Sequence, residues 1–289
     1  MNQPIAWSKS RTNRMIECEV AFCKEYSYFQ KPSKQKIRTP WEIMLYCSRV
    51  SINKYLEILN QKRGRCHYSL LYDNLEFLIR QESSQNNILL KSREIQLQKK
   101  SRNIPFIDEN MLLKHVDYAK KRVASFLQTP LIDELAKAHT IWYQVDNLNS
   151  YWDNGKQIFS APNLVIESNN NIRLITFQLQ NSSSKINHSR VSYGHLIWAL
   201  ENEYLPDEPA LYRTEIYSWS GSGWDTYEQH LDKTEVMSFK SLTSKDIEKM
   251  GNLISEYKKS GYSNLKGPES KLTCKRCRNL DFCNYSLLD

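Results

Sequence analysis

The sequence of 289 residues has no hydrophobic run close to the ~20 residues that a membrane-spanning helix needs. Its mean hydropathy of −0.63 also argues against a membrane protein. No apolar segment follows the charges in the opening MNQPIAWSKS, so we expect no secretory signal peptide. The 17 Tyr, 7 Trp and 9 Phe exclude a disordered chain. Together these features predict a cytosolic globular protein with no membrane partner.

The chain also lacks internal repeats, low-complexity tracts and a Gly/Ser-rich or Pro-rich linker. We therefore expect one domain over residues 1–289. Within it, residues 1–103 are expected to be mainly helical, residues 104–260 to form an α/β core and residues 261–289 to carry a cysteine cluster.

Hydrophobic periodicity predicts an alternation of helices and strands after the first, mainly helical region. Helices are expected over 41–60, 68–81 and 192–203. Two further helices are expected to begin near residue 111 and near Ser244, and residues 83–87 are expected to form a loop. Thr129 followed by Pro130 is typical of the N-cap and first residue of a further short helix. Strands are expected over 141–148, 162–167, 172–180, 211–219 and 224–227. This order favours an α/β sandwich.

Positive charge is spread unevenly along the chain. There are 40 Lys and Arg against 32 Asp and Glu, a formal net charge of +8, yet residues 141–240 hold seven basic and twelve acidic residues. Basic flanks around a more acidic centre favour a polyanionic partner such as nucleic acid. A basic but otherwise ordinary soluble protein is the alternative.

Three of the seven cysteines form a C-x2-C-x5-C motif, which consists of Cys274, Cys277 and Cys283. Disulfides are rare in cytosolic proteins, whereas thiolates at this spacing can bind one metal centre. A tetrahedral metal ion or an iron–sulfur cluster needs a fourth ligand. No histidine lies near the motif, so the sequence predicts a metal centre with a remote fourth ligand.

Cys18 is the leading candidate, because its surroundings resemble a known N-terminal element. RecB-like nucleases of the PD-(D/E)XK superfamily carry Ser-x-Ser-(Lys/Arg), then aromatic-x-x-Cys, with aromatic residues after it. Iron–sulfur members of this family, including AddB and the CRISPR-associated RecB-like exonucleases, pair that cysteine with a C-terminal C-x2-C-x5-C. Met15 stands where an aromatic residue is usual; the residues that match in order are Ser8, Ser10, Arg11, Cys18, Phe22 and Tyr26.

The resemblance implies a restriction-endonuclease-like core, with a mixed central sheet flanked by helices and termini joined by an iron–sulfur cluster. It implies a [4Fe-4S] cluster on Cys18, Cys274, Cys277 and Cys283, with Cys23 as the reserve for Cys18. A zinc ion on the same four thiolates is the alternative. Cys47 and Cys66 are expected to be buried small hydrophobic residues.

The catalytic motif of this family consists of Pro-Asp-Leu on one strand and (Asp/Glu)-x-Lys on the next, and its carboxylates hold Mg²⁺ or Mn²⁺. At the corresponding positions this chain has Asn163, Thr176 and Gln178. Neutral groups bind a hard divalent cation poorly, so we expect no catalytic Mg²⁺ or Mn²⁺ and a pseudonuclease. The family's Gln-x-x-x-Tyr on the following helix corresponds to Gly194-x-x-x-Trp198, which retains only an aromatic residue.

A pseudonuclease of this kind is expected to bind DNA, as a single strand or a duplex end, or to scaffold a nucleic-acid-processing complex in defence, recombination or repair. If a cluster joins the termini, five cations lie close together and Trp198 is available to stack on a base. Lys99, Lys100 and Arg102 form either a second basic patch or a plain exposed loop. The alternatives are an active exonuclease with migrated catalytic residues and a structural subunit that binds only a protein partner. The five cations are Arg11, Arg14, Lys275, Arg276 and Arg278.

Overall fold

The computed structural model describes residues 5–27, 37–62, 69–146, 148–168, 171–180, 185–230 and 232–288. The chain forms two compact units, and each unit is drawn from three stretches of sequence. Unit 1 consists of Met1–Lys9, Ser51–Tyr68 and Lys121–Glu248, and unit 2 of Ser10–Val50, Ser69–Lys120 and Lys249–Asp289. Boundaries between them fall inside the helices α1 (Lys9–Glu17), α3 (Pro40–Lys62), α5 (Glu109–Leu127) and α8 (Lys233–Ser260), and one falls at the start of α4 (Ser69–Leu97).

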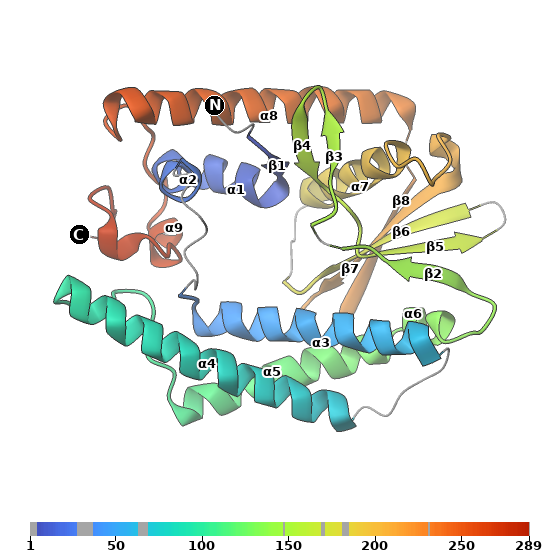
Figure 1. Cartoon of the computed structure of the whole chain (residues 1–289), viewed down its shortest axis with the longest axis horizontal. Helices are drawn as coiled ribbons and strands as arrows, with labels where there is room; N and C mark the ends of the chain where they lie inside the picture. The colour runs from blue at the N-terminus through green and yellow to red at the C-terminus, as the bar shows by residue number, and fades with distance from the viewer. Residues whose placement is uncertain are drawn as a thin grey trace. The chain divides into compact units, whose positions relative to one another are not determined.

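Unit 1 contains a five-stranded mixed sheet (Figure 1). The strand order is β2 (Ile141–Gln144), β5 (Leu164–Ser168), β6 (Asn171–Gln178), β7 (Tyr212–Trp219) and β8 (Trp224–His230). Neighbouring strands are antiparallel except β6 and β7, which are parallel. The connection between these two parallel strands runs through α7 (Lys185–Leu200), which packs on β7 and β8, and through the short η1 (Pro209–Leu211).

A second, smaller mixed sheet of unit 1 consists of β1 (Trp7–Ser8), β4 (Lys156–Phe159) and β3 (Tyr151–Asp153). β1 pairs with β4 in parallel, whereas β3 and β4 form an antiparallel hairpin. Asn154 and Gly155 both have positive φ at the turn of this hairpin, as a tight two-residue turn requires. The predicted mixed α/β architecture with helices around the sheets is therefore confirmed.

Successive side chains of β6 point to opposite faces of the five-stranded sheet and contact different helices of unit 1. Phe177 contacts Phe126 of α5 edge to face, with ring centroids 4.8 Å apart, and Phe126 contacts Trp224 in the same manner. Thr176 points to the other side of β6, where its hydroxyl meets α7. The short helix α6 (Pro130–Leu135) begins after Thr129, as predicted, and buries Leu131, Ile132 and Leu135.

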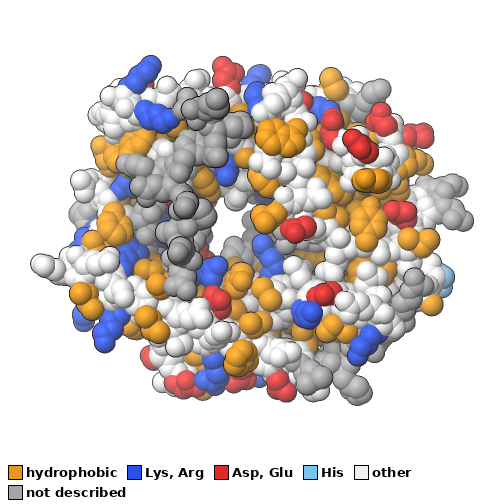
Figure 2. All heavy atoms as spheres, in the orientation of Figure 1, with side chains coloured by type: hydrophobic (Ala, Val, Ile, Leu, Met, Phe, Trp, Pro, Cys, Tyr) orange, Lys and Arg blue, Asp and Glu red, His pale blue; other side chains and the backbone are white. Residues whose placement is uncertain are grey.

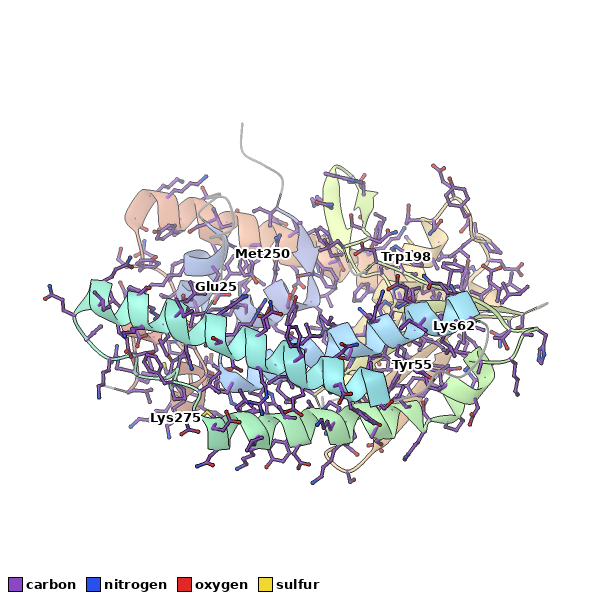
Figure 3. The ribbon with its side chains drawn as sticks, turned by 60° about the horizontal axis from the view of Figure 1, so that its bottom comes forward. Glu25, Tyr55, Lys62, Trp198, Met250 and Lys275 are labelled. Atoms are coloured by element: carbon purple, nitrogen blue, oxygen red, sulfur yellow. The ribbon has the colours of Figure 1, made fainter. Side chains whose placement is uncertain are left out.

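Unit 2 is helical in the part that the structure describes. It contains α1 (Lys9–Glu17) from Ser10 onward, α2 (Glu19–Tyr26), α4 (Ser69–Leu97), α9 (Lys271–Lys275) and η2 (Leu280–Phe282), together with parts of α3, α5 and α8. Figures 1 and 3 show α4 and α5 side by side. Lys120 of α5 binds Glu76 of α4 at 2.7 Å, which ties the two helices together. No helix in the described ranges is both long and apolar enough to span a membrane.

Two sequence predictions about helices are wrong. Residues 83–87 are not a loop but lie inside α4, where Ser83 and Asn86 are buried. The polar side chains that suggested a loop bind other segments instead: Asn86 accepts the backbone N–H of Arg38, and Asn87 exchanges two hydrogen bonds with the backbone of Ile107.

The last long helix starts before the expected Ser244. α8 begins at Lys233, because Asp232 accepts the backbone N–H of Glu235 and caps the helix there. The β3–β4 hairpin was not predicted, and β2 ends at Gln144, well before the expected residue 148. After β2, the Asp146 side chain accepts the N–H of Leu148 and turns the chain.

Candidate metal centre and strand hairpin

Four cysteines from the two ends of the chain line one small cavity in unit 2, which we call the cysteine cavity. Its volume is about 20 Å³. Cys18 comes from the junction of α1 and α2, and Cys274, Cys277 and Cys283 come from α9 and the segment after it. The other lining residues are Val20, Ala21, Lys24, Pro268, Thr273, Asn279 and Leu280. The structure therefore brings the four predicted ligands together.

Three of these four sulfurs accept N–H hydrogen bonds. Cys18 is the N-cap of α2 and accepts the backbone N–H of Ala21 at 3.4 Å. The sulfur of Cys274 accepts the backbone N–H of Leu287 at 3.5 Å, and that of Cys277 accepts Nη2 of Arg14 at 3.2 Å. Donors of this kind stabilise the negative charge of a metal-bound thiolate.

The four thiols fit a thiolate-bound metal ion or iron–sulfur cluster in their number and chemistry. Burial raises the pKa of Cys18, while the Ala21 N–H and the Arg14 charge act in the opposite direction. As the described side chains are placed, no three His, Cys, Asp or Glu form a group arranged to hold one metal ion. The site therefore fits a metal centre in the type of its ligands and in the N–H donors to their sulfurs. No coordination geometry is assigned.

Cys23, the reserve for Cys18, does not line the cysteine cavity. It is fully buried one turn further along α2, and its thiol donates to the carbonyl of Leu253 at 3.6 Å. Burial raises the pKa of Cys23 to about 12, and it does the same for the buried Cys47 of α3. Cys66 lies outside the described residues.

The carboxylate of Glu25, whose side chain is 10% exposed, binds several residues around the cavity. It accepts Nη2 of Arg14 at 2.6 Å, Nη2 of Arg278 at 3.1 Å and Nδ2 of Asn279 at 3.0 Å. Nothing in the motif spacing marked Glu25, because its role depends on contacts with residues more than 250 positions away. Arg14 and Arg278, which we expected at a DNA surface, are thus in ion pairs.

The other residues predicted to bind nucleic acid have different surroundings. Arg11 lies over the ring of Tyr26, with its guanidinium carbon 5.0 Å from the ring centroid. Lys275, the last residue of α9, and Arg276 are exposed, and Lys275 is labelled in Figure 3. In unit 1, Trp198 is only 3% exposed, and its indole donates to Asn149 at 3.1 Å. Among these residues, Lys275 and Arg276 are the most accessible cations.

The segment Lys99–Asn103 is largely exposed, as one alternative predicted, but it also binds the C-terminal segment. Lys99 binds the carbonyl of Asp281 and Arg102 that of Leu280, each at 2.7 Å, and Asn103 donates to the carbonyl of Cys277. This segment therefore holds the chain between Cys277 and Cys283. On the face that Figure 2 shows, Lys and Arg are interspersed with Asp and Glu among the coloured residues.

The β5–β6 hairpin of unit 1 carries the three positions of the expected catalytic motif. Leu164 pairs with Ile175, so Asn163 lies opposite Thr176. Asn163 accepts the backbone N–H of Phe177 through Oδ1 at 2.8 Å, and its own N–H binds the carbonyl of Ile175. Gln178 ends β6 and is half-buried.

Thr176 is engaged by a buried histidine that sequence reasoning missed. The hydroxyl of Thr176 lies 2.7 Å from Nε2 of His195 on α7, and Nδ1 of His195 lies 2.7 Å from the carbonyl of Ser160. Burial lowers the pKa of His195 to about 4, so the ring is neutral near pH 7. The neutral ring then donates to Ser160 through Nδ1 and accepts the Thr176 hydroxyl through Nε2.

The contact between α7 and Ser160 needs the glycine beside His195. A Cβ on Gly194 would lie 3.1 Å from the Cβ of Ser160, which is tighter than ordinary packing. Gly194 therefore lets the helix approach closely enough for His195 to reach Ser160. The glycine at the start of the Gly-x-x-x-Trp pattern serves packing in this structure.

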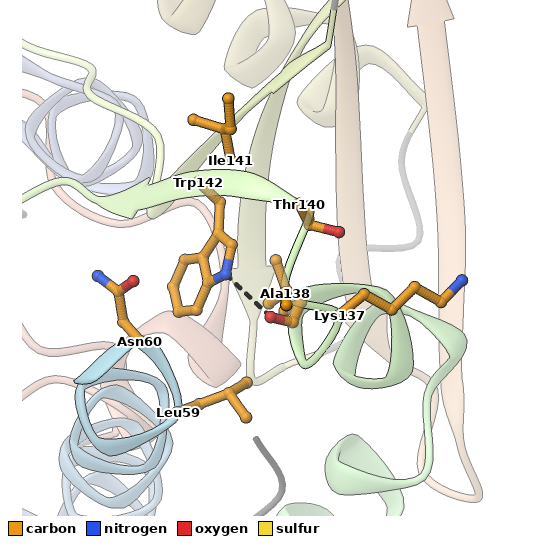
Figure 4. A pocket seen from close by; sticks show the side chains of 8 residues that line it. Leu59, Asn60, Lys137, Ala138, Thr140, Ile141 and Trp142 are labelled. Atoms are coloured by element: carbon orange, nitrogen blue, oxygen red, sulfur yellow. Dashed lines mark hydrogen bonds between the residues drawn. The ribbon is translucent and has the colours of Figure 1, made fainter. Parts of the chain in front are cut away.

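A second cavity of about 120 Å³ lies in unit 1 and is lined by none of the predicted site residues (Figure 4). The indole of Trp142 forms one wall and donates to the carbonyl of Leu135. Of the described residues that line it, Lys137 alone is charged. Without a paired acid and base or a metal ligand, this cavity supports no catalytic assignment; its other lining residues are Leu59, Asn60, Ala138, Thr140 and Ile141.

Comparisons with known proteins do not assign a family. Neither the models of protein families nor the curated proteins include a match to this sequence. The functional argument therefore depends on the cysteine cavity and the β5–β6 hairpin.

Proposed function

We propose that this chain is a RecB-like pseudonuclease, which binds DNA or scaffolds a nucleic-acid-processing complex and carries an iron–sulfur cluster. The observation that carries the proposal is the cysteine cavity, where Cys18 meets Cys274, Cys277 and Cys283. Such a ligand set, drawn from both ends of the chain, is what the resemblance implies. The N–H donors to three of the sulfurs support bound thiolates.

The proposed PD-(D/E)XK core is supported by the order of elements in unit 1. The expected motif needs a strand hairpin followed by a helix, and β5, β6 and α7 follow in that order within a mixed sheet. Asn163 precedes β5, while Thr176 and Gln178 lie on β6. This order supports the proposed frame of the motif, in which the three key positions carry neutral side chains.

The hydrogen bonds made by these neutral side chains favour an inactive protein over an active nuclease with migrated catalytic residues. Asn163 holds the backbone of Phe177, and Thr176 holds His195. Each group therefore has a structural partner at the position where a nuclease needs a free carboxylate. We propose that the hairpin contributes to the fold without cleaving a phosphodiester.

In the proposed centre, Cys18, Cys274, Cys277 and Cys283 would hold the cluster. A bound cluster supplies a cross-link between the α1–α2 junction and the C-terminal segment, which stabilises unit 2 by closing a long loop. The exposed Lys275 and Arg276 lie within the same C-terminal segment. They are the best candidates to bind phosphates beside the centre.

Anaerobic purification followed by iron, sulfide and zinc analysis tests the metal centre. We expect brown protein with about four irons per chain and a broad visible absorption, as a [4Fe-4S] cluster requires. Colourless protein with one zinc per chain would establish the zinc alternative instead. A protein with neither metal would leave the cysteines as buried thiols and refute the proposal.

A salt series of binding to single-stranded and duplex DNA tests the second half of the proposal. We expect Lys275→Gln/Arg276→Gln to weaken binding and to reduce the salt dependence by about two phosphate contacts. Lys245→Gln/Lys259→Gln removes the same charge from exposed positions on α8 and serves as the matched control. Equal loss in both double variants would indicate net charge rather than a site.

Two further outcomes separate the alternatives. Release of nucleotides with Mg²⁺ or Mn²⁺ present would establish an active nuclease with migrated catalytic residues. Absence of DNA binding together with a stoichiometric co-purified protein would favour a purely structural subunit.

A further inference from the structure

We propose that Arg14 tunes the reduction potential of the centre at the cysteine cavity; this inference rests on the iron–sulfur cluster proposed above. Nη2 of Arg14 donates to the sulfur of Cys277 at 3.2 Å. The same guanidinium binds Oε1 of Glu25 through Nε at 3.0 Å and through Nη2 at 2.6 Å. One arginine therefore connects the Glu25 carboxylate to a predicted cluster ligand.

The position of Arg14 is fixed by Glu25. The Arg14 side chain is 13% exposed and that of Glu25 is 10% exposed, so the pair is largely removed from solvent. Arg278 and Asn279, which directly follow Cys277, also bind Glu25. Glu25 thus holds both Arg14 and the chain beside Cys277, and this keeps the N–H donor on the sulfur.

Arg14 and Arg278 place two positive charges near Cys277, and Arg14 contacts its sulfur directly. Both guanidinium groups pair with Glu25, and Arg14 also lies 3.9 Å from the more exposed carboxylate of Glu17. Reduction adds one electron to a cluster and makes it more negative, so positive charge and N–H donors to sulfur stabilise the reduced form. Arg14 consequently raises the reduction potential relative to the same centre without it.

This role differs from the phosphate contact that the sequence predicted for Arg14. The donors of its guanidinium are directed at Glu25 and Cys277 within unit 2. Lys275 and Arg276, by contrast, are exposed. Of the five predicted basic residues, Arg14 and Arg278 are thus bound beside the centre, Arg11 lies over Tyr26, and Lys275 and Arg276 are exposed.

A redox titration of anaerobically purified protein tests the inference. Dithionite supplies the electron through soluble mediators, and the electron paramagnetic resonance signal of the reduced cluster gives the midpoint potential. We expect Arg14→Gln to shift the midpoint to a more negative potential, because it removes a positive charge and the guanidinium donor. Glu25→Gln removes the negative charge but retains an oxygen acceptor for Arg14, so we expect a shift to a more positive potential.

The control is Lys271→Gln, which removes an exposed positive charge at the start of α9 and should leave the midpoint unchanged. Iron content and visible absorption are measured first on every variant. Wild-type protein with zinc and no iron would refute the proposed cluster. Iron-loaded Arg14→Gln with an unshifted midpoint would refute the tuning role alone. Loss of iron from Arg14→Lys, which keeps the charge, would also overturn it, since Arg14 would then hold the centre together instead.

Discussion

Asn163 and Phe177 are joined across the β5–β6 hairpin by a hydrogen bond of 2.8 Å, from the backbone N–H of Phe177 to Oδ1 of Asn163. This bond places a side chain where the antiparallel ladder needs an acceptor. An aspartate at position 163 would offer an oxygen of the same geometry and would add a negative charge. The neutral residue therefore supplies this acceptor but is a weaker ligand for a hard divalent cation than an aspartate would be.

Replacement of Asn163 tests how much the hairpin depends on that bond. Asn163→Ala leaves the N–H of Phe177 without its acceptor, and we expect a loss of about 1–3 kcal/mol in the free energy of unfolding. Asn163→Asp keeps the acceptor and should be nearly neutral. Urea unfolding followed by tryptophan fluorescence measures both, since Trp142, Trp198 and Trp219 belong to unit 1. Asn60→Ala, at an exposed position, is the control.

His195 makes the stability of unit 1 depend on pH. Its pKa is lowered to about 4 by burial, whereas an unfolded chain protonates histidine near ~6.5. The unfolded state therefore binds the extra proton between these values, and stability falls as the pH drops from about 6.5 toward 4. The slope is at most ~1.4 kcal/mol per pH unit.

Unfolding measured at pH 7, 6 and 5 checks this expectation. His195→Gln cannot titrate, so its stability should change less over this range than that of the wild type. His139→Gln alters an exposed histidine and should keep the wild-type slope. A variant at position 195 with the full wild-type slope would show that another group is responsible.

The two cysteines at the start of the chain provide a matched pair for the metal centre. Cys18 lines the cysteine cavity, whereas Cys23 donates to the carbonyl of Leu253. We expect Cys18→Ser to lose most of the bound metal and Cys23→Ser to retain it. Metal analysis of the two purified variants decides between them, and the reverse result would make Cys23 the fourth ligand.

Removal of the proposed cluster should loosen the two segments that it would join. Cys18 lies between α1 and α2, and the other three proposed ligands lie between residues 274 and 283. We expect hydrogen exchange of the backbone amides to increase in residues 10–26 and 271–288 after chelation or oxidative loss of the cluster. The amides of β5 and β6 in unit 1 are the internal reference, and their exchange should not change.

Local patterns in the sequence predicted most elements of the fold. Alternating apolar residues gave β5, β6 and β7, and Thr129-Pro130 gave the start of α6. The β3–β4 hairpin was missed, although Asn154-Gly155 is an equally local signal for a tight hairpin turn. The pairing of β1 with β4 had no such signal, because β1 has two residues and its partner lies about 150 positions away.

The four cysteines that line the cysteine cavity could be identified from the sequence, but their surroundings could not. Cys274, Cys277 and Cys283 could be recognised from the sequence, because their spacing is typical of a metal-binding motif. The choice between Cys18 and Cys23 depends on the end of α1 at Glu17, which makes Cys18 an N-cap directed to the cavity. The roles of Glu25 and Asp281 could not be predicted from any local spacing, since their partners come from distant parts of the chain.

Asp281 lies between Cys277 and Cys283 in the sequence, and its carboxylate is fully buried. It accepts Nη2 of Arg93 at 2.5 Å, the hydroxyl of Ser101 at 2.9 Å and the backbone N–H of Arg102 at 2.8 Å. The side chain of Asp281 is 0% exposed and that of Arg93 is 13% exposed. Loss of the carboxylate would therefore leave a largely buried guanidinium without its counter-charge.

We expect Asp281→Ala to destabilise unit 2 by about 3 kcal/mol, as removal of one partner from a buried ion pair does. Asp281→Asn retains an oxygen acceptor for the Arg102 N–H, so its loss should be smaller, about 1–2 kcal/mol. Urea unfolding followed by far-ultraviolet circular dichroism measures both, with Asp73→Asn at an exposed position of α4 as the control. Equal, small effects at positions 281 and 73 would contradict this role, because an exposed aspartate contributes little to stability.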